Sequence, residues 1–411
     1  MARLTPELIA TDCGIRLVYL HDRGAASGTF GINVNAGSSA DEPGAEGTAH
    51  FVEHTIFKGT RRRSPWHIIN RMEAIGATLE AYTNKDETVV YSVFPGNNAA
   101  RAIELIADLA SESQFPEREI EKERQVVLDE IDSYLDDPAE AIYDSFEEKL
   151  LAGTPWAHNI LGSAATVSRL GSADCRRFLE RYYTKSNIVA FYSGPQSAAA
   201  VSALVSRHFG SLRQGEALWR GGSSQESPAP FDIGRNLPCH QSHVLTGMQT
   251  VGIRSPRRYA VALLANMTGG PGMNSLLNVE LREKRGLVYN VESSAVFFNS
   301  IGYMGVYFGC DAEDTALCRR LARDVFARIA DGALTPRRIA AAKKQYLGQL
   351  SLDSRTARVT GAATAVHCFG QPVSQAETEE AIHAVTAADL ADVAASFATA
   401  SSLAFLPDSG D

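Results

Sequence analysis

Two histidines and a glutamate stand close together in the segment GTAHFVEHTIFKGT. His50, Glu53 and His54 have the spacing i, i+3 and i+4, which places them on one face of a helix, within an arc of about 100°. Their neighbours are largely apolar, so we expect this helix to be partly buried. Two imidazoles one turn apart can bind the same divalent metal ion, and a glutamate between them can act on a metal-bound water.

A catalytic zinc site normally has three protein ligands plus water, so a third ligand is needed. We expect it in the segment FPEREIEKERQVVLDEIDSYLDD, whose proline and acidic residues are typical of a helix N-terminus. Glu123 and Glu130 fall within the apolar stripe of this helix, where carboxylates are costly unless a metal or another partner receives them. One can bind the metal while the other supports a ligating histidine, and we favour Glu130 as the ligand and Glu123 as the support.

Composition and charge exclude several classes of protein. The chain has 411 residues, 45% of them hydrophobic and 21% charged, which is enough for two or more domains. A net charge of −9 argues against a nucleic-acid partner, and no apolar run approaches the ~20 residues of a membrane span. The first residues show no signal-peptide pattern, so we expect a cytoplasmic protein with no membrane partner.

The order of elements predicts a duplication. A Gly/Ser/Pro-rich stretch within residues 216–240 reads as an exposed linker. On each side of it come a strand, a helix, two further strands, a long helix, a proline-containing turn and another long helix. This matched order predicts an α+β unit, a sheet with helices packed on one face, made twice. We therefore expect a zinc-binding catalytic domain over residues 1–215 and a second domain over 241–411.

Four segments together carry a family resemblance: HFVEHTIFKGT, AYTNKDETVVY, EIEKERQVVLDEI and LREKRGLVY, in this order. The His-x-x-Glu-His motif followed by a glutamate on a later helix resembles the inverted zinc motif of the pitrilysin family, also called inverzincins. That family of zinc metallopeptidases includes insulin-degrading enzyme and the mitochondrial processing peptidase. The chain is most similar to the small bacterial members related to the processing peptidase.

The resemblance implies a role for each residue of the first motif set. One zinc ion per chain would be bound by His50, His54 and Glu130. Glu53 would be the general base of peptide-bond hydrolysis, and Glu123 the supporting acid.

The resemblance also implies substrate-binding residues. In LREKRGLVY it places a substrate-binding arginine at Arg282 and a substrate-binding and catalytic tyrosine at Tyr289. In AYT the family commonly has an asparagine before the alanine, where it helps to hold the substrate backbone; here Glu80 precedes Ala81. A carboxylate at this position can favour a basic substrate side chain or weaken backbone binding, and both effects remain open.

The length of the chain predicts how many subunits form the active protein. Family members enclose substrate between two halves of a clamshell, each a pair of similar domains, and this chain is long enough for one half. The resemblance therefore implies a homodimer in which the domain with Arg282 and Tyr289 faces the zinc of the partner subunit; a heterodimer with a related chain is the other option. The implied activity is hydrolysis of short unfolded peptides inside a closed dimeric chamber.

Two other functions compete with this one. Relatives that act as catalytically silent scaffolds or peptide-binding subunits usually lack part of the zinc motif, which is complete here. A metal-binding structural protein would need a fourth protein ligand. His67, the nearest histidine in sequence, is expected to be an ordinary helix residue.

Overall fold

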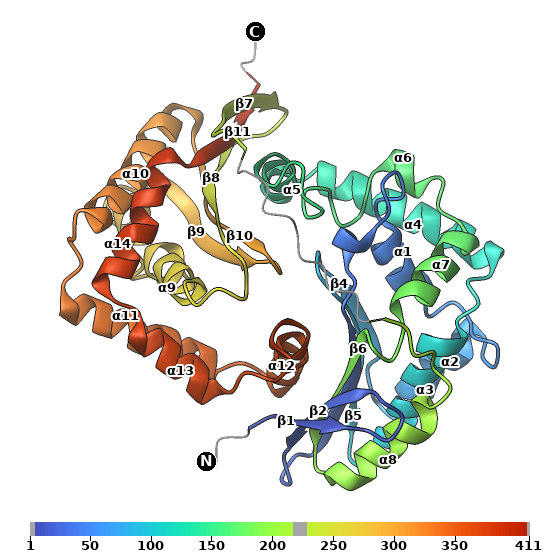
Figure 1. Ribbon diagram of the computed structural model, residues 1–411. Coiled ribbons are helices and arrows are strands. Elements are labelled where there is room, and N and C mark those ends of the chain that lie inside the picture. Colours follow the sequence, from blue (N-terminus) through green and yellow to red (C-terminus); the bar gives the residue numbers. More distant parts are fainter. Residues whose placement is uncertain (1–4, 217–227, 409–411) are drawn as a thin grey trace. The chain divides into compact units, whose positions relative to one another are not determined.

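The computed structural model describes residues 5–216 and 228–408, and the chain divides into two compact units (Figure 1). The first unit comprises the described residues of Met1–Asp132, His158–Arg220 and Asp353–Gln375. The second comprises those of Ser133–Ala157, Gly221–Leu352 and Ala376–Asp411. Each unit combines a mixed sheet with helices, so the predicted α+β fold is confirmed. Residues 217–227, in the expected linker, lie outside the described residues.

The first unit is built on a six-stranded sheet in the order β1-β2-β6-β3-β5-β4. β2 and β6 are parallel, and every other neighbouring pair is antiparallel. The strands are β1 (Glu7–Ala10), β2 (Arg16–His21), β3 (Ser27–Val34), β4 (Glu80–Thr83), β5 (Thr88–Pro95) and β6 (Ile188–Gly194).

The second unit is built on a five-stranded sheet in the order β7-β11-β8-β10-β9. β7 and β11 are parallel and the other neighbouring pairs are antiparallel. The order β2-β6-β3-β5-β4 of the first sheet has its parallel pair at the same place, which confirms the predicted internal duplication. The strands are β7 (Asp232–Leu237), β8 (Ser242–Val251), β9 (Val288–Phe297), β10 (Ile301–Cys310) and β11 (Ser401–Pro407).

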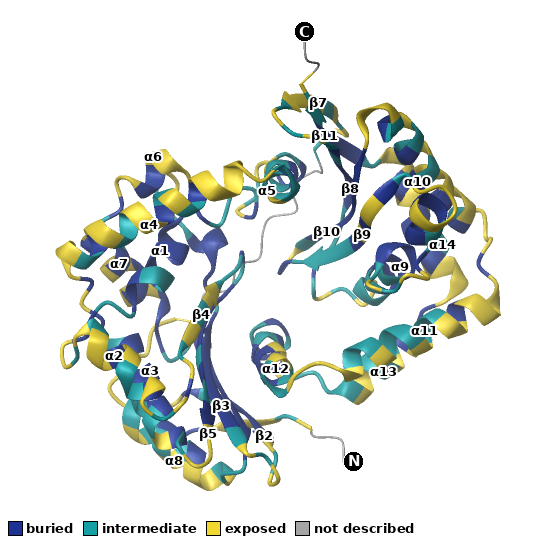
Figure 2. Ribbon diagram, turned by 180° about the vertical axis from the view of Figure 1, so that it is seen from behind, coloured by how far each residue is buried: buried dark blue, intermediate teal, exposed yellow. Residues whose placement is uncertain are grey.

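The sequence predicted helices on one face of each sheet, but helices cover both faces of the first sheet. This is why β3 and β6 are buried along almost their whole length (Figure 2). The main core of this unit joins the sheet to α1, α3, α7 and α8, while α12 covers the opposite face. The helices are α1 (Thr48–Thr55), α2 (Pro65–Glu73), α3 (Ala99–Glu112), α4 (Glu117–Leu135), α6 (Ala164–Val167), α7 (Ser172–Tyr182), α8 (Ala198–Phe209) and α12 (Arg355–Phe369), with the 3₁₀ turn η1 (Ser38–Ala40).

The second sheet is covered in the same way, by α9, α10 and α14 on one face and by α5 on the other. The helical elements of this unit are α5 (Pro138–Leu150), α9 (Arg258–Gly269), α10 (Thr315–Ala330), α11 (Pro336–Ser351), α13 (Gln375–Ala384), α14 (Ala387–Ser396), the π-type turn η2 (Asn278–Glu283) and the 3₁₀ turns η3 (Ala312–Asp314) and η4 (Phe397–Thr399).

The two units differ from the expected domains 1–215 and 241–411 by an exchange of helices. α5 packs Ile142 and Phe146 against the second sheet, and α12 packs Val359 and Val366 against the first. Each sheet has an apolar second face that its own half of the chain leaves open, and the helix from the other half buries it. A contiguous boundary drawn along the sequence cannot represent this exchange.

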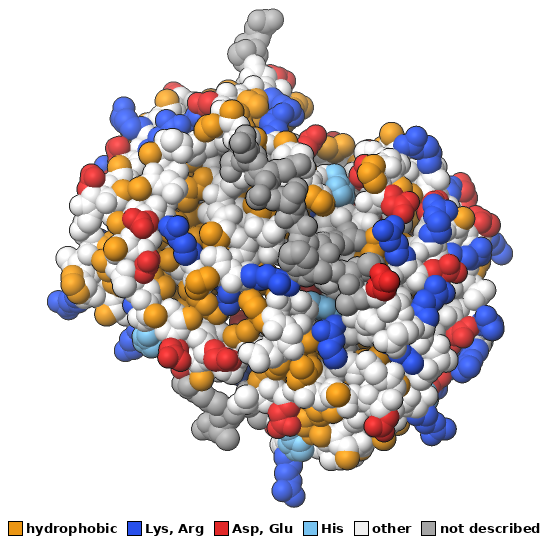
Figure 3. All heavy atoms as spheres, in the orientation of Figure 1, with side chains coloured by type: hydrophobic (Ala, Val, Ile, Leu, Met, Phe, Trp, Pro, Cys, Tyr) orange, Lys and Arg blue, Asp and Glu red, His pale blue; other side chains and the backbone are white. Residues whose placement is uncertain are grey.

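On the face shown in Figure 3, acidic and basic side chains are interspersed. Within the described residues no single helix is long and apolar enough to cross a membrane. Only α13 together with Ala387–Thr399, a pair bent by 81°, meets the length and composition required.

Candidate metal and catalytic centre

The segment with both histidines forms α1, so its three polar side chains lie on one helix face. His50 is buried, with 7% of its surface exposed, while Glu53 and His54 are half-buried. The ring centroids of His50 and His54 lie 4.6 Å apart. One turn of helix therefore presents two imidazoles side by side.

A buried carboxylate holds the start of α1. Gly47, which precedes the helix, has a φ of 95°, and a Cβ there would lie 2.4 Å from the carbonyl oxygen of Leu161, so glycine is required. Glycine has no capping side chain. Instead, Asp41 accepts hydrogen bonds from the backbone N–H groups of Gly47 (2.7 Å) and Ala49 (2.9 Å). Nε2 of His158 lies 3.6 Å from the same carboxylate, whose side chain is fully buried.

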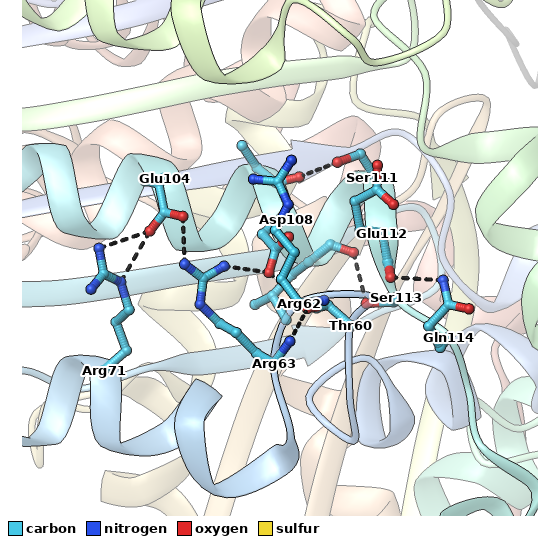
Figure 4. Close-up of polar contacts among 12 residues, drawn as sticks. Thr60, Arg62, Arg63, Arg71, Glu104, Asp108, Ser111, Glu112, Ser113 and Gln114 are labelled. Atoms are coloured by element: carbon cyan, nitrogen blue, oxygen red, sulfur yellow. Dashed lines mark hydrogen bonds and ion pairs between the residues drawn. The ribbon is translucent and has the colours of Figure 1, made fainter.

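Arg63 anchors the loop that follows α1 (Figure 4). Its guanidinium donates hydrogen bonds to Glu104 and Asp108 of α3, each at 2.5 Å. Thr60 donates to the same oxygen of Asp108 at 2.8 Å, and Arg71 of α2 pairs with the other oxygen of Glu104 at 2.9 Å. The histidine helix is thus fixed at both ends by contacts within the protein.

α4 brings Glu130 to the two histidines. Its Oε2 lies 3.8 Å from Nε2 of His50 and 3.5 Å from Nε2 of His54. One donor atom from each of the three residues lies within 4.8 Å of the others. Within the described residues this is the only such cluster of three or more histidine, cysteine or acidic side chains.

These separations fit a zinc ion. Nitrogen and oxygen ligands about 2.0–2.2 Å from a tetrahedral zinc lie roughly 3.3–3.6 Å from one another. The two distances from Glu130 to the imidazoles are within a few tenths of an ångström of that range. Three protein ligands leave one tetrahedral position open for water or substrate, as in catalytic rather than structural sites. His67 does not join the cluster and instead shares a hydrogen bond of 2.8 Å with Ser64 at the start of α2.

Glu123 lies on the other side of His54. Its Oε2 is 3.5 Å from Nδ1 of His54, and its Oε1 is 2.7 Å from Nζ of Lys58. The carboxylate therefore contacts the histidine nitrogen that points away from Glu130. This is the position of a group that orients a metal ligand without binding the metal itself.

Burial controls protonation at the centre. Burial and the neighbouring His54 lower the pKa of His50 from 6.5 to about 3, so this imidazole is neutral at pH 7, the form that binds metal. Burial raises the pKa of Glu53, with the charge of Glu130 adding to the shift and hydrogen bonds from Thr83 opposing it. A glutamate with a raised pKa is better suited to accept and return a proton near neutral pH.

Sequence reasoning missed four residues around the centre: Asp41, Lys58, Thr83 and Tyr183. Lys58 stands at i+4 from His54, so helical spacing alone could have found it. Thr83 lies in the segment AYT already quoted for the family resemblance, although nothing there linked it to Glu53. Asp41 and Tyr183 come from separate segments and carried no local signal. Tyr183, which follows α7, has a buried hydroxyl with no hydrogen-bond partner among the described residues, and its pKa is raised by burial and by the charge of Glu53.

The segment AYT forms β4, at the edge of the first sheet. Ala81 packs against the core that includes α1, and Thr83 hydrogen-bonds Glu53, so both face the histidine helix. Glu80 alternates with them and points to the opposite face, where it accepts a hydrogen bond from the hydroxyl of Tyr91. Its carboxylate therefore does not share the metal's side of the sheet.

Arg282 and Tyr289 belong to the second unit. Arg282 lies in η2 and lines a groove of about 310 Å³ with the loop Gly269–Met273 and β9. Tyr289 is on β9 and is 83% exposed. Gly286, between them, has a φ of 64° and makes the turn from η2 into the strand.

Two family models match the chain. Residues 16–164 match the model described as insulinase (peptidase family M16), and residues 169–346 match the peptidase M16 inactive domain. The ligand cluster lies entirely within the first match.

Similar proteins span almost the same length. The chain is 32% identical to an uncharacterized zinc protease of Mycobacterium tuberculosis, over 96% of this chain and 91% of that protein. It is 31% identical to one of Streptomyces coelicolor, over 93% and 84% of the two chains. Among solved structures, a peptidase M16 inactive domain from Pseudomonas fluorescens has a TM-score of 0.90 at 21% identity, covering 99% of both chains. A protease from Helicobacter pylori has a TM-score of 0.89 at 19% identity, covering 98% of this chain and 100% of its own.

Proposed function

The chain belongs to the peptidase M16 (insulinase) family, and we propose that it is a zinc-dependent endopeptidase that hydrolyses short unfolded peptides. The observation that carries the proposal is the approach of Glu130 to both histidines, with Glu53 on the same turn of helix. Three ligands with one position left open favour catalysis over a structural role. Relatives at above 30% identity are named zinc proteases, which supports the same activity.

Each side chain has a defined task in this proposal. His50, His54 and Glu130 would hold the metal, which when bound lowers the pKa of water toward ~7 and polarises a carbonyl oxygen. Glu53 accepts the proton of the attacking water and delivers it to the leaving amine. Thr83 hydrogen-bonds the Glu53 carboxylate and so helps to orient it.

The substrate would bind as an additional strand. β4 is the last strand of its sheet, and within the described residues no strand pairs with its outer edge. An extended peptide can pair there through its backbone, with Ala81 and Thr83 on the side of the histidine helix. Backbone pairing selects extended peptides and is compatible with many sequences.

Residues of the second unit would complete the site across a dimer. We propose that Arg282 and Tyr289 of one subunit donate hydrogen bonds to the substrate carbonyl oxygen held at the metal centre of the partner, as negative charge develops there. Two chains would then enclose a chamber with two active sites, and its closure would exclude folded proteins.

The location of the protein in the cytoplasm also remains a prediction.

The alternative is a catalytically silent, peptide-binding subunit of a heterodimer. The name of the second family model, an inactive domain, applies to residues 169–346, which contribute none of the ligand cluster. All members of that cluster are present in the first half, so we favour the active enzyme.

The deciding experiment compares the wild type with Glu53→Gln on unstructured peptides of graded length, read by mass spectrometry. We expect the wild type to cleave and Glu53→Gln to bind zinc with little or no turnover. Cleavage by the variant at the wild-type rate would remove Glu53 from the mechanism. No cleavage by either, with zinc and dimer present, would favour the silent subunit.

A further inference from the structure

The exposed face of β4 carries an unusual trio of side chains. Glu80 and Tyr82 point to the same face, because they are two residues apart on a strand. Glu80 is paired in register with Tyr91 of β5, and Tyr82 with Val89. Tyr91 and Val89 pack toward the cluster that includes α12, so this is the face opposite the histidine helix.

Glu80 has Tyr91 directly across the strand pair and Tyr82 two residues along its own strand. It accepts a hydrogen bond from the hydroxyl of Tyr91, directly across the strand pair. Tyr82 is diagonal to Tyr91 on the same face, within reach of long side chains. Glu80 is exposed and Tyr82 is 38% exposed, so both can be contacted from the free edge.

Among the described residues, the carboxylate of Glu80 has no basic partner. Within the described residues no lysine, arginine or histidine forms an ion pair with Glu80, although many other surface carboxylates of the first unit, such as Glu104 and Glu112, are paired. Tyr91 holds its orientation without neutralising its charge. A negative charge with two aromatic side chains on the same face of the sheet is a receptor for a cation, through Coulomb attraction and cation–π contact.

We propose that Glu80, Tyr82 and Tyr91 form a subsite for a lysine or arginine side chain of the peptide that pairs with β4. This inference rests on the proposed peptidase function and adds a substrate class to it. Side chains of an added strand alternate between the two faces of the sheet. The basic residue is therefore selected at one fixed position relative to the scissile bond. The substrate residues on either side of it project to the other face of the sheet, so this trio does not select them.

The expected preference is modest, because the subsite is exposed. An exposed ion pair with one cation–π contact corresponds to about a five- to tenfold preference for lysine over glutamine at the selected position.

The test uses a set of unstructured peptides of one length and fixed neutral sequence, in which lysine, glutamine or glutamate is placed at each position in turn. Wild-type kcat/KM values should give a lysine-to-glutamine ratio of about five to ten at one position. In Glu80→Gln the ratio should fall toward one, and in Glu80→Lys glutamate should become the preferred residue there. As a matched control, Glu73→Gln removes a charge from exposed α2 and should keep the wild-type ratio.

A peptide-binding assay with inactive variants tests the subsite independently of the proposed peptidase activity. Labelled lysine and glutamine peptides are titrated into Glu53→Gln and into the double variant Glu53→Gln/Glu80→Gln, with affinity read by fluorescence anisotropy. A preference for lysine that disappears in the double variant supports the subsite, even if the wild type shows no turnover. Equal affinities for both peptides in Glu53→Gln, or an equal preference in both proteins, would overturn the subsite while leaving the peptidase function to its own test.

Discussion

Oε2 of Glu123 lies 3.5 Å from Nδ1 of His54, while Oε1 of the same carboxylate lies 2.7 Å from Nζ of Lys58. The histidine is thereby contacted on both nitrogens, by Glu123 on one side and Glu130 on the other. A carboxylate at the outer nitrogen fixes the tautomer and the ring orientation of a ligating histidine. The lysine in turn holds the carboxylate.

We expect Glu123→Gln to bind zinc about 10- to 100-fold more weakly than the wild type, because the amide no longer fixes the His54 ring as a charged acceptor. Zinc affinity is measured by competition with a chromophoric chelator. Glu121→Gln, on the exposed face of the same helix, serves as the control and should retain wild-type affinity. Equal zinc affinity in the wild type and Glu123→Gln would contradict this role.

Lys58→Met should weaken zinc binding by a smaller factor, about threefold to tenfold, since Glu123 remains but loses the cation that orients it. Lys58→Arg keeps a cation on a long side chain and should recover most of the affinity. The same chelator competition measures both. If the methionine and arginine variants lose affinity alike, the lysine acts through packing and not through its charge.

Removing a ligand should remove the metal. We expect His54→Ala and Glu130→Ala to lose stoichiometric zinc after dialysis, because each leaves only two protein ligands. Metal content is measured by elemental analysis, with circular dichroism to verify folding. His67→Ala is the matched histidine control and should keep one zinc per chain. Full zinc retention in either ligand variant would refute its assignment.

The buried His50 gives the metal-free protein a defined pH dependence. Its pKa is about 3 when folded and ordinarily 6.5, so between these values the unfolded chain binds a proton that the folded protein does not. The stability linked to this residue is therefore present above pH 6.5 and is lost as the pH falls toward 3, by up to about 1.4 kcal/mol per pH unit.

Denaturant titrations of the metal-free protein at pH 4 to 8 test this linkage. The unfolding free energy of His50→Gln should fall less steeply below pH 6.5 than that of the wild type, because the titrating imidazole is gone. His67→Gln, on exposed α2, should follow the wild type. Identical slopes in the wild type and His50→Gln would show that His50 is not held neutral by burial.

Asp41 should matter for both stability and metal binding. Asp41→Ala leaves the N–H groups of Gly47 and Ala49 without their acceptor, and we expect a loss of about 1–3 kcal/mol of stability. Thr335→Ala removes the N-cap of α11 in the second unit and should cost about 1 kcal/mol. Urea titrations measure both. Only the Asp41 variant should also bind zinc more weakly, and unchanged zinc affinity would mean that the cap does not position the histidines.

A composite site across the dimer can be tested by mixing two inactive variants. If Arg282 acts on the metal centre of the partner subunit, Arg282→Ala and Glu53→Gln should each be nearly inactive. Their mixture, after subunit exchange, should recover about one quarter of wild-type activity, because half of the dimers are hybrid and each has one intact site. No recovery in dimers shown to exchange would place Arg282 in the site of its own chain.

Much of the centre could be predicted because its pattern is local. The backbone hydrogen bonds of an α-helix set 3.6 residues per turn, so the spacing of His50, Glu53 and His54 determined that they share a face. The same argument placed Glu123 and Glu130 on one stripe of a second helix. The repeated order of elements was also readable along the chain, and it correctly predicted two similar α+β units.

Other features depended on contacts between distant segments. The sequence placed Glu123 and Glu130 on one stripe, but only the packing of α4 against α1 set Glu130 between both imidazoles and Glu123 behind one of them. Strand pairing placed Glu80 beside Tyr91, on the face away from the histidines. The exchange of α5 and α12 arose because each sheet had a second apolar face to bury. Helical spacing is enforced within a few residues, whereas these arrangements follow from burial of surfaces that lie far apart along the chain, so only the tertiary structure decided them.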